Sequence, residues 1–272
     1  MTTTERAGKQ PSLAVASGRK FVDTTKGRWT IRIVTLVVLL TVWQVGTQNL
    51  NRAVAAPPTE ILVAFWQQLF VTGSIWLPLV QSLGVLFGGL AIALVIGIPI
   101  GVAMGRSKTL SYLLDPYVTF LYALPHVALV PLMIILLGFD WPFRLTYVVF
   151  ASVWLVLINT MVGVSTVDTA YTDVSIAYTA SERQIIRHVI FPAAAPYIVA
   201  GGRQAFSVAV AAVVISEILS NLAGLGGQIQ LFAVQYLTAN MFVSIVLIML
   251  IAVATQATTA WLQRKLTPWQ LS

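Results

Sequence analysis

Long apolar segments alternate with short polar segments over most of the 272 residues. Six of the apolar segments are long enough to cross about 30 Å of hydrocarbon as helices that rise 1.5 Å per residue. They cover roughly residues 31–47, 77–104, 116–138, 145–165, 194–219 and 241–262. An open sheet cannot satisfy its backbone in lipid, and the segments lack the alternation of barrel strands. The pattern therefore predicts an all-α integral membrane protein with six spanning helices.

The flanks of the first span raise the question of a signal peptide, because residues 53–56 imitate a signal-peptidase site. A long basic region, a first apolar run longer than about 7–15 residues and several later spans favour a permanent anchor instead. We expect residues 1–29 to form a disordered cytoplasmic tail and residues 30–268 to form one transmembrane domain. Residues 57–70 contain two prolines and then Glu60, which predicts a short interfacial helix.

The composition supports a membrane protein and excludes several other classes. Apolar residues make up 58% of the chain and charged residues only 9%, whereas about a quarter of an ordinary soluble domain is charged. The net charge of +7 does not indicate nucleic-acid binding, because the basic residues lie between apolar runs and not on one folded soluble face. With no cysteine and two histidines, the chain offers no disulfide or thiolate site, and we expect no metal site.

The distribution of positive charge predicts the orientation of the chain. Thirteen lysines and arginines lie before the first span, after the second and fourth spans and after the last. They are Arg6, Lys9, Arg19, Lys20, Lys26, Arg28, Arg32, Arg106, Lys108, Arg183, Arg187, Arg264 and Lys265. The opposite loops carry only Arg52 and Arg144. Because positive residues are retained on the cytoplasmic side, both termini are expected in the cytoplasm.

Glycine and proline mark two of the spans. Glycines recur four residues apart along the second span, so each set lies on one helical face, either for close helix packing or facing lipid. They are Gly84, Gly88, Gly97, Gly101 and Gly105. In the third span Pro125 and Pro131 remove backbone hydrogen bonds that only neighbouring groups or water can replace, so we expect this helix inside the bundle.

Several polar residues within the spans are candidates for the translocation pathway or its gate. His126, beside Pro125, either lines the pathway or hydrogen-bonds a neighbouring carbonyl. Glu217 either acts at a gate or reaches the outer interface. Asn159 either contacts the solute or hydrogen-bonds between helices. Arg203 either lines the pathway or extends to the cytoplasmic interface.

The segment between the fourth and fifth spans, residues 166–193, is too long for a simple turn. Its apolar residues recur at steps of three and four, with a polar interruption at 181–184, and Pro192 is expected to stop the run. The spacing predicts two short helices that meet near Ser181. Such a pair either transmits a push from a soluble partner to the membrane helices or lies on the inner leaflet.

This segment resembles the EAA loop of ABC importer permeases, with the pattern Glu-Ala-Ala, three residues, Gly, nine residues, Ile-x-Leu-Pro. The spacing matches throughout, whereas identity holds only at the proline. The corresponding residues are Asp173, Val174 and Ser175, then Thr179, then Val189, Phe191 and Pro192. Threonine in place of glycine adds a Cβ where the loop should bend, which strains the turn if the backbone stays left-handed. We therefore expect either a reshaped turn or a different docking partner.

Similar stretches extend over roughly residues 55–268 and resemble the nitrate/sulfonate/taurine branch of these permeases. They read APPTEILVAFWQQL, GIPIGVAMGRSK, LLDPYVTFLYALPHVALVPLMIILLGF, LINTMVGV and FPAAAPYIVAGGRQAFSVAVAAVVISEIL. The resemblance implies a six-helix bundle of the type I ABC importer permease kind, with cytoplasmic coupling helices between spans four and five. It also implies a multi-pass protein of the bacterial cytoplasmic (inner) membrane.

The resemblance further implies the partners of the chain. The loop would dock in a groove of cytoplasmic ABC ATPase subunits, through the matched positions together with Ser181, Glu182, Arg183 and Arg187. A second permease, either another copy or a paralogue, would complete the pathway in the bilayer, and an extracytoplasmic binding protein would deliver the solute. ATP and magnesium would bind the partner ATPase, and no cofactor would bind this chain.

The motifs that are missing from the sequence agree with a non-catalytic subunit. No G-x-x-x-x-G-K-[ST] occurs, so ATP hydrolysis needs another subunit. Neither G-x-S-x-G nor H-E-x-x-H occurs, which weakens an intramembrane hydrolase. An ion-gradient-driven secondary transporter is the alternative, although such carriers usually show internal repeats and more intramembrane carboxylates. The solute stays open between small anions, such as sulfonates or nitrate, and neutral heterocycles.

Overall fold

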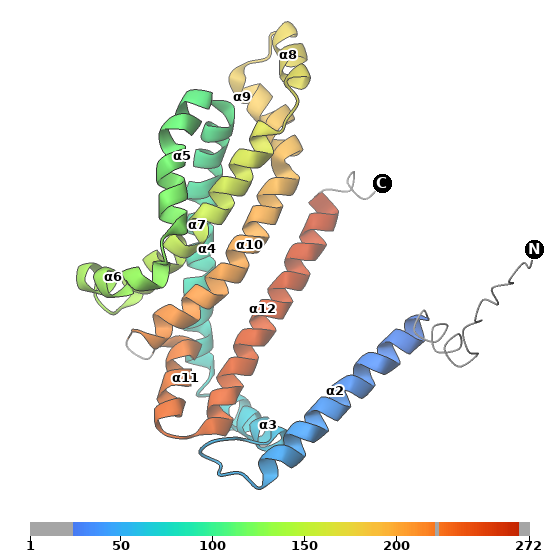
Figure 1. Ribbon diagram of the computed structural model, residues 1–272, viewed down its shortest axis with the longest axis vertical. Helices are drawn as coiled ribbons and strands as arrows, with labels where there is room; N and C mark the ends of the chain where they lie inside the picture. Colours follow the sequence, from blue (N-terminus) through green and yellow to red (C-terminus); the bar gives the residue numbers. More distant parts are fainter. Residues whose placement is uncertain (1–23, 221–222, 267–272) are drawn as a thin grey trace, which may run out of the picture.

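The computed structural model describes residues 24–220 and 223–266, and every regular element in these ranges is a helix (Figure 1). Five helical stretches there are long and apolar enough to cross a membrane, and a sharply bent pair would be a sixth if it crosses as one span. The long helices are α2 (Thr25–Gln48), α4 (Trp76–Arg106), α7 (Trp141–Ser165), α10 (Phe191–Ile218) and α12 (Thr238–Leu266).

The shorter elements lie at the two ends of the bundle and at the break in one span. They are α3 (Pro58–Trp66), the π-helix η1 (Gln67–Val71), α5 (Lys108–Ala123), the 3-10 helix η2 (His126–Leu129), α6 (Val130–Leu137), α8 (Thr169–Ala177), α9 (Glu182–Ile185), the π-helix η3 (Ile186–Ile190) and α11 (Gly224–Val234). Figure 1 shows α8, α9 and the turn between α4 and α5 at one end, here named the α8 end. Helices α3 and α11 lie at the opposite end, here named the α3 end.

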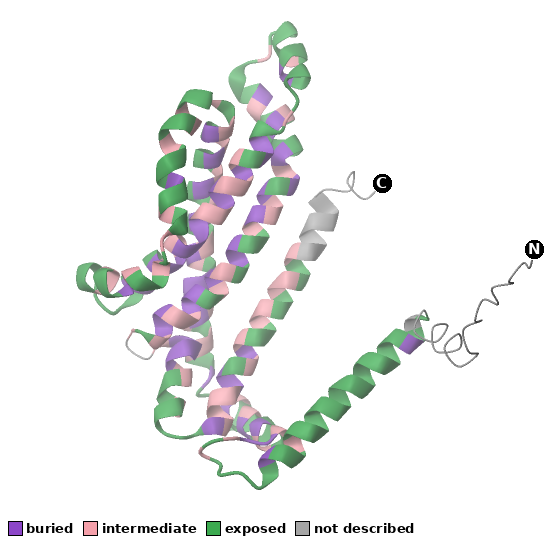
Figure 2. Ribbon diagram, viewed as in Figure 1, coloured by how far each residue is buried: buried purple, intermediate pink, exposed green. Residues whose placement is uncertain are grey.

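Helices α4, α7 and α10 form the centre of the structure. Buried residues concentrate on these three helices, whereas α2 is exposed along most of its length (Figure 2). The largest fully buried side chains of the central cluster are Phe143 and Tyr147 of α7, which pack with Val85 of α4 and with Ala209 of α10. The apolar surface that α4, α7 and α10 share is therefore buried against protein, and most of α2 is left for lipid or another subunit.

The glycine face of the second span packs against α7. A Cβ at Gly101 would lie 2.6 Å from the carbonyl oxygen of Leu157, and a Cβ at Gly105 would lie 2.6 Å from the Cβ of Val164. Only the absence of a side chain allows the two backbones to approach this closely. The prediction that this face mediates close helix packing is confirmed.

The third predicted span is not one helix. Helix α5 ends at Ala123, and the helical segment that begins at His126 is bent away from it by 84°. Pro125 lies at the break, where its missing N–H and its ring prevent a continuous helix. The expectation that this span is enclosed in the bundle is wrong for the single chain, because Val118 is the only buried residue that α5 contributes.

The boundary between the predicted tail, residues 1–29, and the first spanning helix also differs from expectation. Helix α2 begins at Thr25, with Thr24 Oγ1 accepting a hydrogen bond from Gly27 N at 3.1 Å, so residues 25–29 are helical and do not belong to a tail. Residues 1–23 of the predicted tail, and residues 267–268 of the predicted domain, lie outside the described residues. Arg144, which the charge pattern predicts in an outer loop, lies in the first turn of α7 and is buried.

Candidate functional site

The segment between α7 and α10 begins with a short, capped helix. Helix α8 starts after Asp168, whose side chain accepts a hydrogen bond from Ala170 N at 2.9 Å. Such a side-chain cap satisfies a backbone donor that has no partner within the helix. One face of α8 rests on the bundle through the buried Thr172, while Tyr171 and Val174 on other faces are exposed.

The end of α8 shows how the chain accommodates threonine at the expected glycine position. Thr179 has a φ of 60°, so the left-handed conformation is kept despite the Cβ. The turn is closed by hydrogen bonds from Thr179 N to Ile176 O at 2.8 Å and from Ala180 N to Ser175 O at 3.0 Å. The turn is therefore not reshaped, and the residue carries the strain of a β-branched side chain in this region, about 1–2 kcal/mol.

The second helix of the segment continues into the membrane. Ser181 N donates to Oε1 of Gln184 at 2.8 Å and starts α9, which runs without a gap through η3 into α10. The expectation that Pro192 stops the helix is therefore wrong. The π-helical turn η3 ends at Ile190, two residues before the proline, and this wider hydrogen-bonding pattern accommodates a residue that cannot donate. A displacement of α9 is thus transmitted directly to α10.

A second connection joins this segment to α4. Arg106, the last residue of α4, donates from Nη2 and Nε to Oε1 of Glu182 at 2.7 and 3.2 Å. Glu182 is consequently paired within its own chain, although its side chain remains largely exposed. Helix α9 is therefore bonded to the end of α4 and is also continuous, through η3, with α10.

The remaining residues that the resemblance singled out form one surface at the α8 end. The exposed members are Asp173, Val174, Thr179, Ser181, Glu182, Arg183, Arg187, Phe191 and Pro192, whereas Ser175 and Val189 are half-buried. Several neighbouring apolar side chains are also exposed, with Tyr178 at 83% and Tyr171 at 65%. A groove of about 780 Å³ lies among these residues, between α8 on one side and η3 and the start of α10 on the other.

The predicted pathway residues do not form one site. His126 lies at the break of the third span, in η2, and its ring packs against Tyr147 with the centroids 5.8 Å apart. Asn159 donates from Nδ2 to Oε1 of Gln204 at 3.3 Å and so connects α7 to α10. Glu217 lies near the other end of α10, where it has different partners.

Glu217 is fully buried, so it does not reach the outer interface. Its carboxylate accepts hydrogen bonds from Ser82 Oγ at 2.8 and 2.9 Å and from Gly226 N at 2.9 Å. The carboxylate therefore caps the N-terminus of α11, where the helix dipole favours a negative charge. Gly224 has a φ of +71°, and a Cβ there would collide with this carboxylate.

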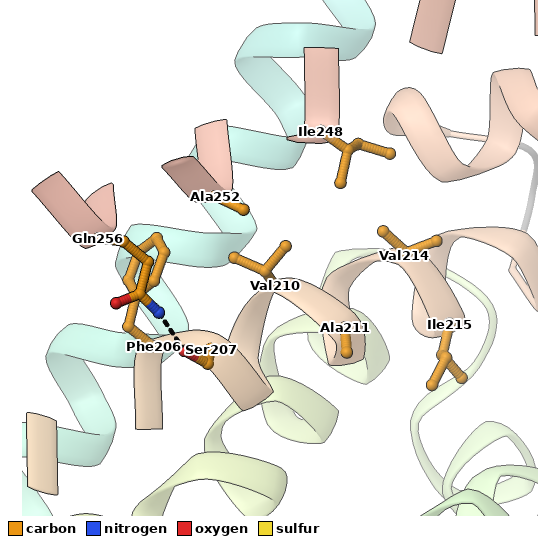
Figure 3. A pocket seen from close by; sticks show the side chains of 9 residues that line it. All are labelled: Phe206, Ser207, Val210, Ala211, Val214, Ile215, Ile248, Ala252 and Gln256. Carbon is orange, nitrogen blue, oxygen red and sulfur yellow. Dashed lines mark hydrogen bonds between the residues drawn. The ribbon is translucent and has the colours of Figure 1, made fainter. Parts of the chain in front are cut away.

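A polar cluster that the sequence did not show as a unit lies along α10, with one partner on α7 and another on α12, and Arg203 is part of it. Arg203 Nε donates to Oε1 of Gln256 at 3.0 Å. Nε2 of Gln256 donates to Ser207 Oγ at 2.6 Å, which Figure 3 shows as a dashed line. With Gln204 and Asn159, these residues form what we name the α10 polar cluster. The spacing of Arg203, Gln204 and Ser207 on one turn of α10 was the available signal, but Gln256 is distant in sequence.

Comparison with known proteins places the chain in a family. Residues 93–269 match the family described as the binding-protein-dependent transport system inner membrane component. The chain belongs to this family. It is accordingly a multi-pass permease subunit of an ABC importer in the inner membrane, and it is not catalytic, since the ATPase is a separate partner. A substrate-binding protein is the other partner that the family implies.

Two relatives and one solved structure extend the comparison. The taurine transport system permease protein TauC of Escherichia coli (strain K12) is 32% identical over 90% of this chain and 93% of its own length. SsuC of Bacillus subtilis (strain 168), which is named for aliphatic sulfonates transport, is 28% identical over 100% of this chain and 99% of its own length. A chain of the MetNI methionine ABC transporter, solved in inward facing conformations, has a TM-score of 0.61 at 18% identity and covers 74% of this chain and 98% of that one. The last likeness supports the fold alone.

Proposed function

We propose that this permease forms one half of the pathway of an importer for small organosulfonates and that residues 166–193 couple it to the ATPase. In this arrangement the α8 end and both termini are cytoplasmic, and ATP and magnesium bind the partner ATPase. A second permease, a copy or a paralogue, completes the pathway.

The exposed apolar surface of α8 is the observation that supports the coupling role. Tyr171, Val174 and Ile176 of α8, and Tyr178 directly after it, are each more than half exposed. Contiguous apolar residues outside the spanning segments mark contact surfaces. Since α9 continues into α10 and Glu182 is bonded to Arg106, a partner that grips α8 would act on two spanning helices at once.

The proposed orientation rests on the charges at the two ends of the bundle. Four basic residues belong to elements at the α8 end: Arg106 ends α4, Lys108 begins α5, and Arg183 and Arg187 lie in α9 and η3. At the α3 end lies Arg52, which pairs with Glu60 at 2.9 Å, just as Arg106 pairs with Glu182 at the α8 end. The larger number of lysines and arginines at the α8 end favours a cytoplasmic location for that end.

The proposed solute class rests on the relatives. TauC is named for taurine, which carries a sulfonate group, and SsuC is named for aliphatic sulfonates. Both relatives cover nearly the full chain. A small solute with a sulfonate head is therefore the class that this permease is expected to carry.

Cysteine cross-linking tests the coupling role cleanly because the chain has no cysteine of its own. We expect Val174→Cys and Tyr178→Cys to cross-link to single cysteines in the ATPase subunit of the complex. Val54→Cys, which is also exposed but lies near the α3 end, is the matched control and should not react. If neither loop cysteine cross-links in any nucleotide state, α8 lies on the membrane surface and the coupling proposal is wrong.

A further inference from the structure

Arg203 is an exposed, charged side chain in the middle of a spanning helix. It lies close to the midpoint of α10, which runs from Phe191 to Ile218, and it is exposed in the single chain. Charged residues at this depth face a bundle interior or a water-filled cavity, because contact with lipid is costly. Arg203 therefore marks a part of the surface that lipid does not cover in the assembled transporter.

The surroundings of Arg203 argue against a side chain that merely extends to the membrane surface. Its Nε donates a hydrogen bond to Oε1 of Gln256 at 3.0 Å. This bond holds the guanidinium against α12, at the same depth as Gln256. Gln204 and Ser207 beside it are also exposed, and their side chains are too short to reach an interface from mid-helix. Several polar residues from different helices thus meet at one depth.

The positive charge of the cluster has no carboxylate near it. In the sequences of α4, α7, α10 and α12, Glu217 is the only acidic residue. Glu217 is buried under α11 and lies about 21 Å from Arg203 along the helix, at 1.5 Å per residue. Within the described residues, the guanidinium donates one hydrogen bond, from Nε to Gln256. Its terminal nitrogens, Nη1 and Nη2, are therefore available for a ligand.

An apolar groove of about 420 Å³ runs between α10 and α12 from this cluster. Figure 3 shows its walls, with Val210 and Val214 of α10 opposite Ile248 and Ala252 of α12. Ser207 and Gln256, which form the polar end of the groove, belong to the cluster. Donors for an anionic head are therefore next to space for a short apolar body.

We propose that the α10 polar cluster binds the oxyanion head of the transported solute through Arg203, and that the groove receives its aliphatic part. The guanidinium presents parallel N–H donors that match the oxygens of a sulfonate. The side-chain amides of Gln204 and Gln256 add neutral donors around it, while Ser207 Oγ accepts from Gln256 Nε2 and donates to the carbonyl oxygen of Arg203. The inference rests on the proposed organosulfonate function and assigns the substrate class to particular residues.

Uptake by the complete complex in proteoliposomes, with its ATPase and binding protein, tests the role of the charge. The probes are butanesulfonate and methanesulfonate. Arg203→Gln should lower uptake of both roughly tenfold or more, because the charge-assisted hydrogen bonds are lost. Arg203→Lys should recover part of the uptake. Arg52→Gln, which removes an exposed arginine at the α3 end, should leave uptake unchanged.

The groove is tested separately by chain-length selectivity. Ala252→Phe fills the space between α10 and α12 and should lower uptake of butanesulfonate more than uptake of methanesulfonate. A residue with only a structural role would not change this ratio. If the Arg203→Gln complex fails to assemble, the test rests on uptake by Arg203→Lys and on the ratio of butanesulfonate to methanesulfonate uptake in Ala252→Phe. An unchanged ratio overturns the inference.

The outcomes separate this inference from the proposed function. A wild-type complex that imports neither sulfonate overturns the proposed solute class and the inference with it. A wild-type complex that imports both, together with an unaffected Arg203→Gln variant, overturns the inference alone. Mass spectrometry of the purified complexes tests whether the oxyanion at the cluster comes from an anionic lipid instead of the solute. If Arg203→Gln loses a bound anionic lipid while uptake is unchanged, the cluster holds a lipid headgroup and the inference is wrong.

Discussion

Ser82 Oγ lies 2.8 and 2.9 Å from the two carboxylate oxygens of Glu217, although the residues belong to different helices. The same hydroxyl accepts a hydrogen bond from Leu225 N at 2.8 Å. One small side chain thus connects α4, α10 and the first turn of α11. A carboxylate can remain buried in such a place only because donors such as Ser82 Oγ and Gly226 N satisfy its oxygens.

Removing the Glu217 carboxylate should destabilise the permease. Glu217→Ala leaves Ser82 Oγ and Gly226 N without their acceptor in a buried site, at a cost of about 1–3 kcal/mol per donor. Glu217→Gln keeps one oxygen and the shape, so its loss should be smaller. We expect the thermal unfolding temperature of the purified complex to fall in the order wild type, Glu217→Gln, Glu217→Ala.

Transport measurements on the same variants test the gate hypothesis. If Glu217 acts at a gate, Glu217→Gln should reduce uptake while the complex stays assembled. Unchanged uptake in Glu217→Gln with lowered stability in Glu217→Ala would leave a structural connection between helices as its role. Equal unfolding temperatures for all three proteins would contradict the hydrogen-bonding account itself.

The sequence predicted the number of apolar segments well but not their interruptions. Hydrophobic length decides whether a helix can span, and that information is local. Whether a proline breaks a helix depends on its surroundings. Pro125 lies at an 84° bend, whereas Pro192 follows a π-helical turn and is passed without a break.

The candidate site was predictable only where the residues are consecutive. The loop at 166–193 could be found from its length and spacing. The partners of Glu217 and Arg203 could not, because Ser82 and Gln256 approach them from distant parts of the chain. Burial cannot be read from the sequence either, so the sequence alone does not distinguish a gate role of Glu217 from a place at the outer interface.

The packing of α4 on α7 gives a second stability prediction. In Gly101→Ala the new Cβ would lie 2.6 Å from the carbonyl oxygen of Leu157, so the helices must separate. Such overpacking should cost about 1–3 kcal/mol. Gly46→Ala is the matched control, because no atom lies within 4 Å of the Cβ it would add. Thermal unfolding should distinguish the two, and equal stability would show that α4 and α7 adjust freely.

The turn after α8 should become more stable when threonine is replaced by glycine. Thr179 has a φ of 60°, which glycine adopts without strain. Relief of the strain, less the flexibility that glycine adds to the unfolded chain, predicts a gain of about 0.5–1 kcal/mol. Thr179→Ala keeps most of the strain and serves as the control. A Thr179→Gly protein no more resistant to proteolysis of this turn than Thr179→Ala would contradict the strain.

The ion pair between Arg106 and Glu182 should matter for coupling more than for stability. An exposed pair of this kind contributes about 0–1 kcal/mol, so Glu182→Arg should unfold at nearly the wild-type temperature. The same change repels the end of α4 from the start of α9, since it places two like charges together. We therefore expect Glu182→Arg to hydrolyse ATP with reduced uptake per ATP consumed, measured in proteoliposomes.

A charge swap identifies the partner through which Glu182 acts. If its partner is Arg106, the double variant Arg106→Glu/Glu182→Arg restores the pair with opposite polarity, and uptake per ATP should recover. Were Glu182 instead a contact for the ATPase, the second change could not help, because the reversed charge would still face the same partner subunit. Failure of the double variant to recover, with the ATPase still bound, would therefore assign Glu182 to the docking surface and remove the connection between α4 and α9 from the coupling mechanism.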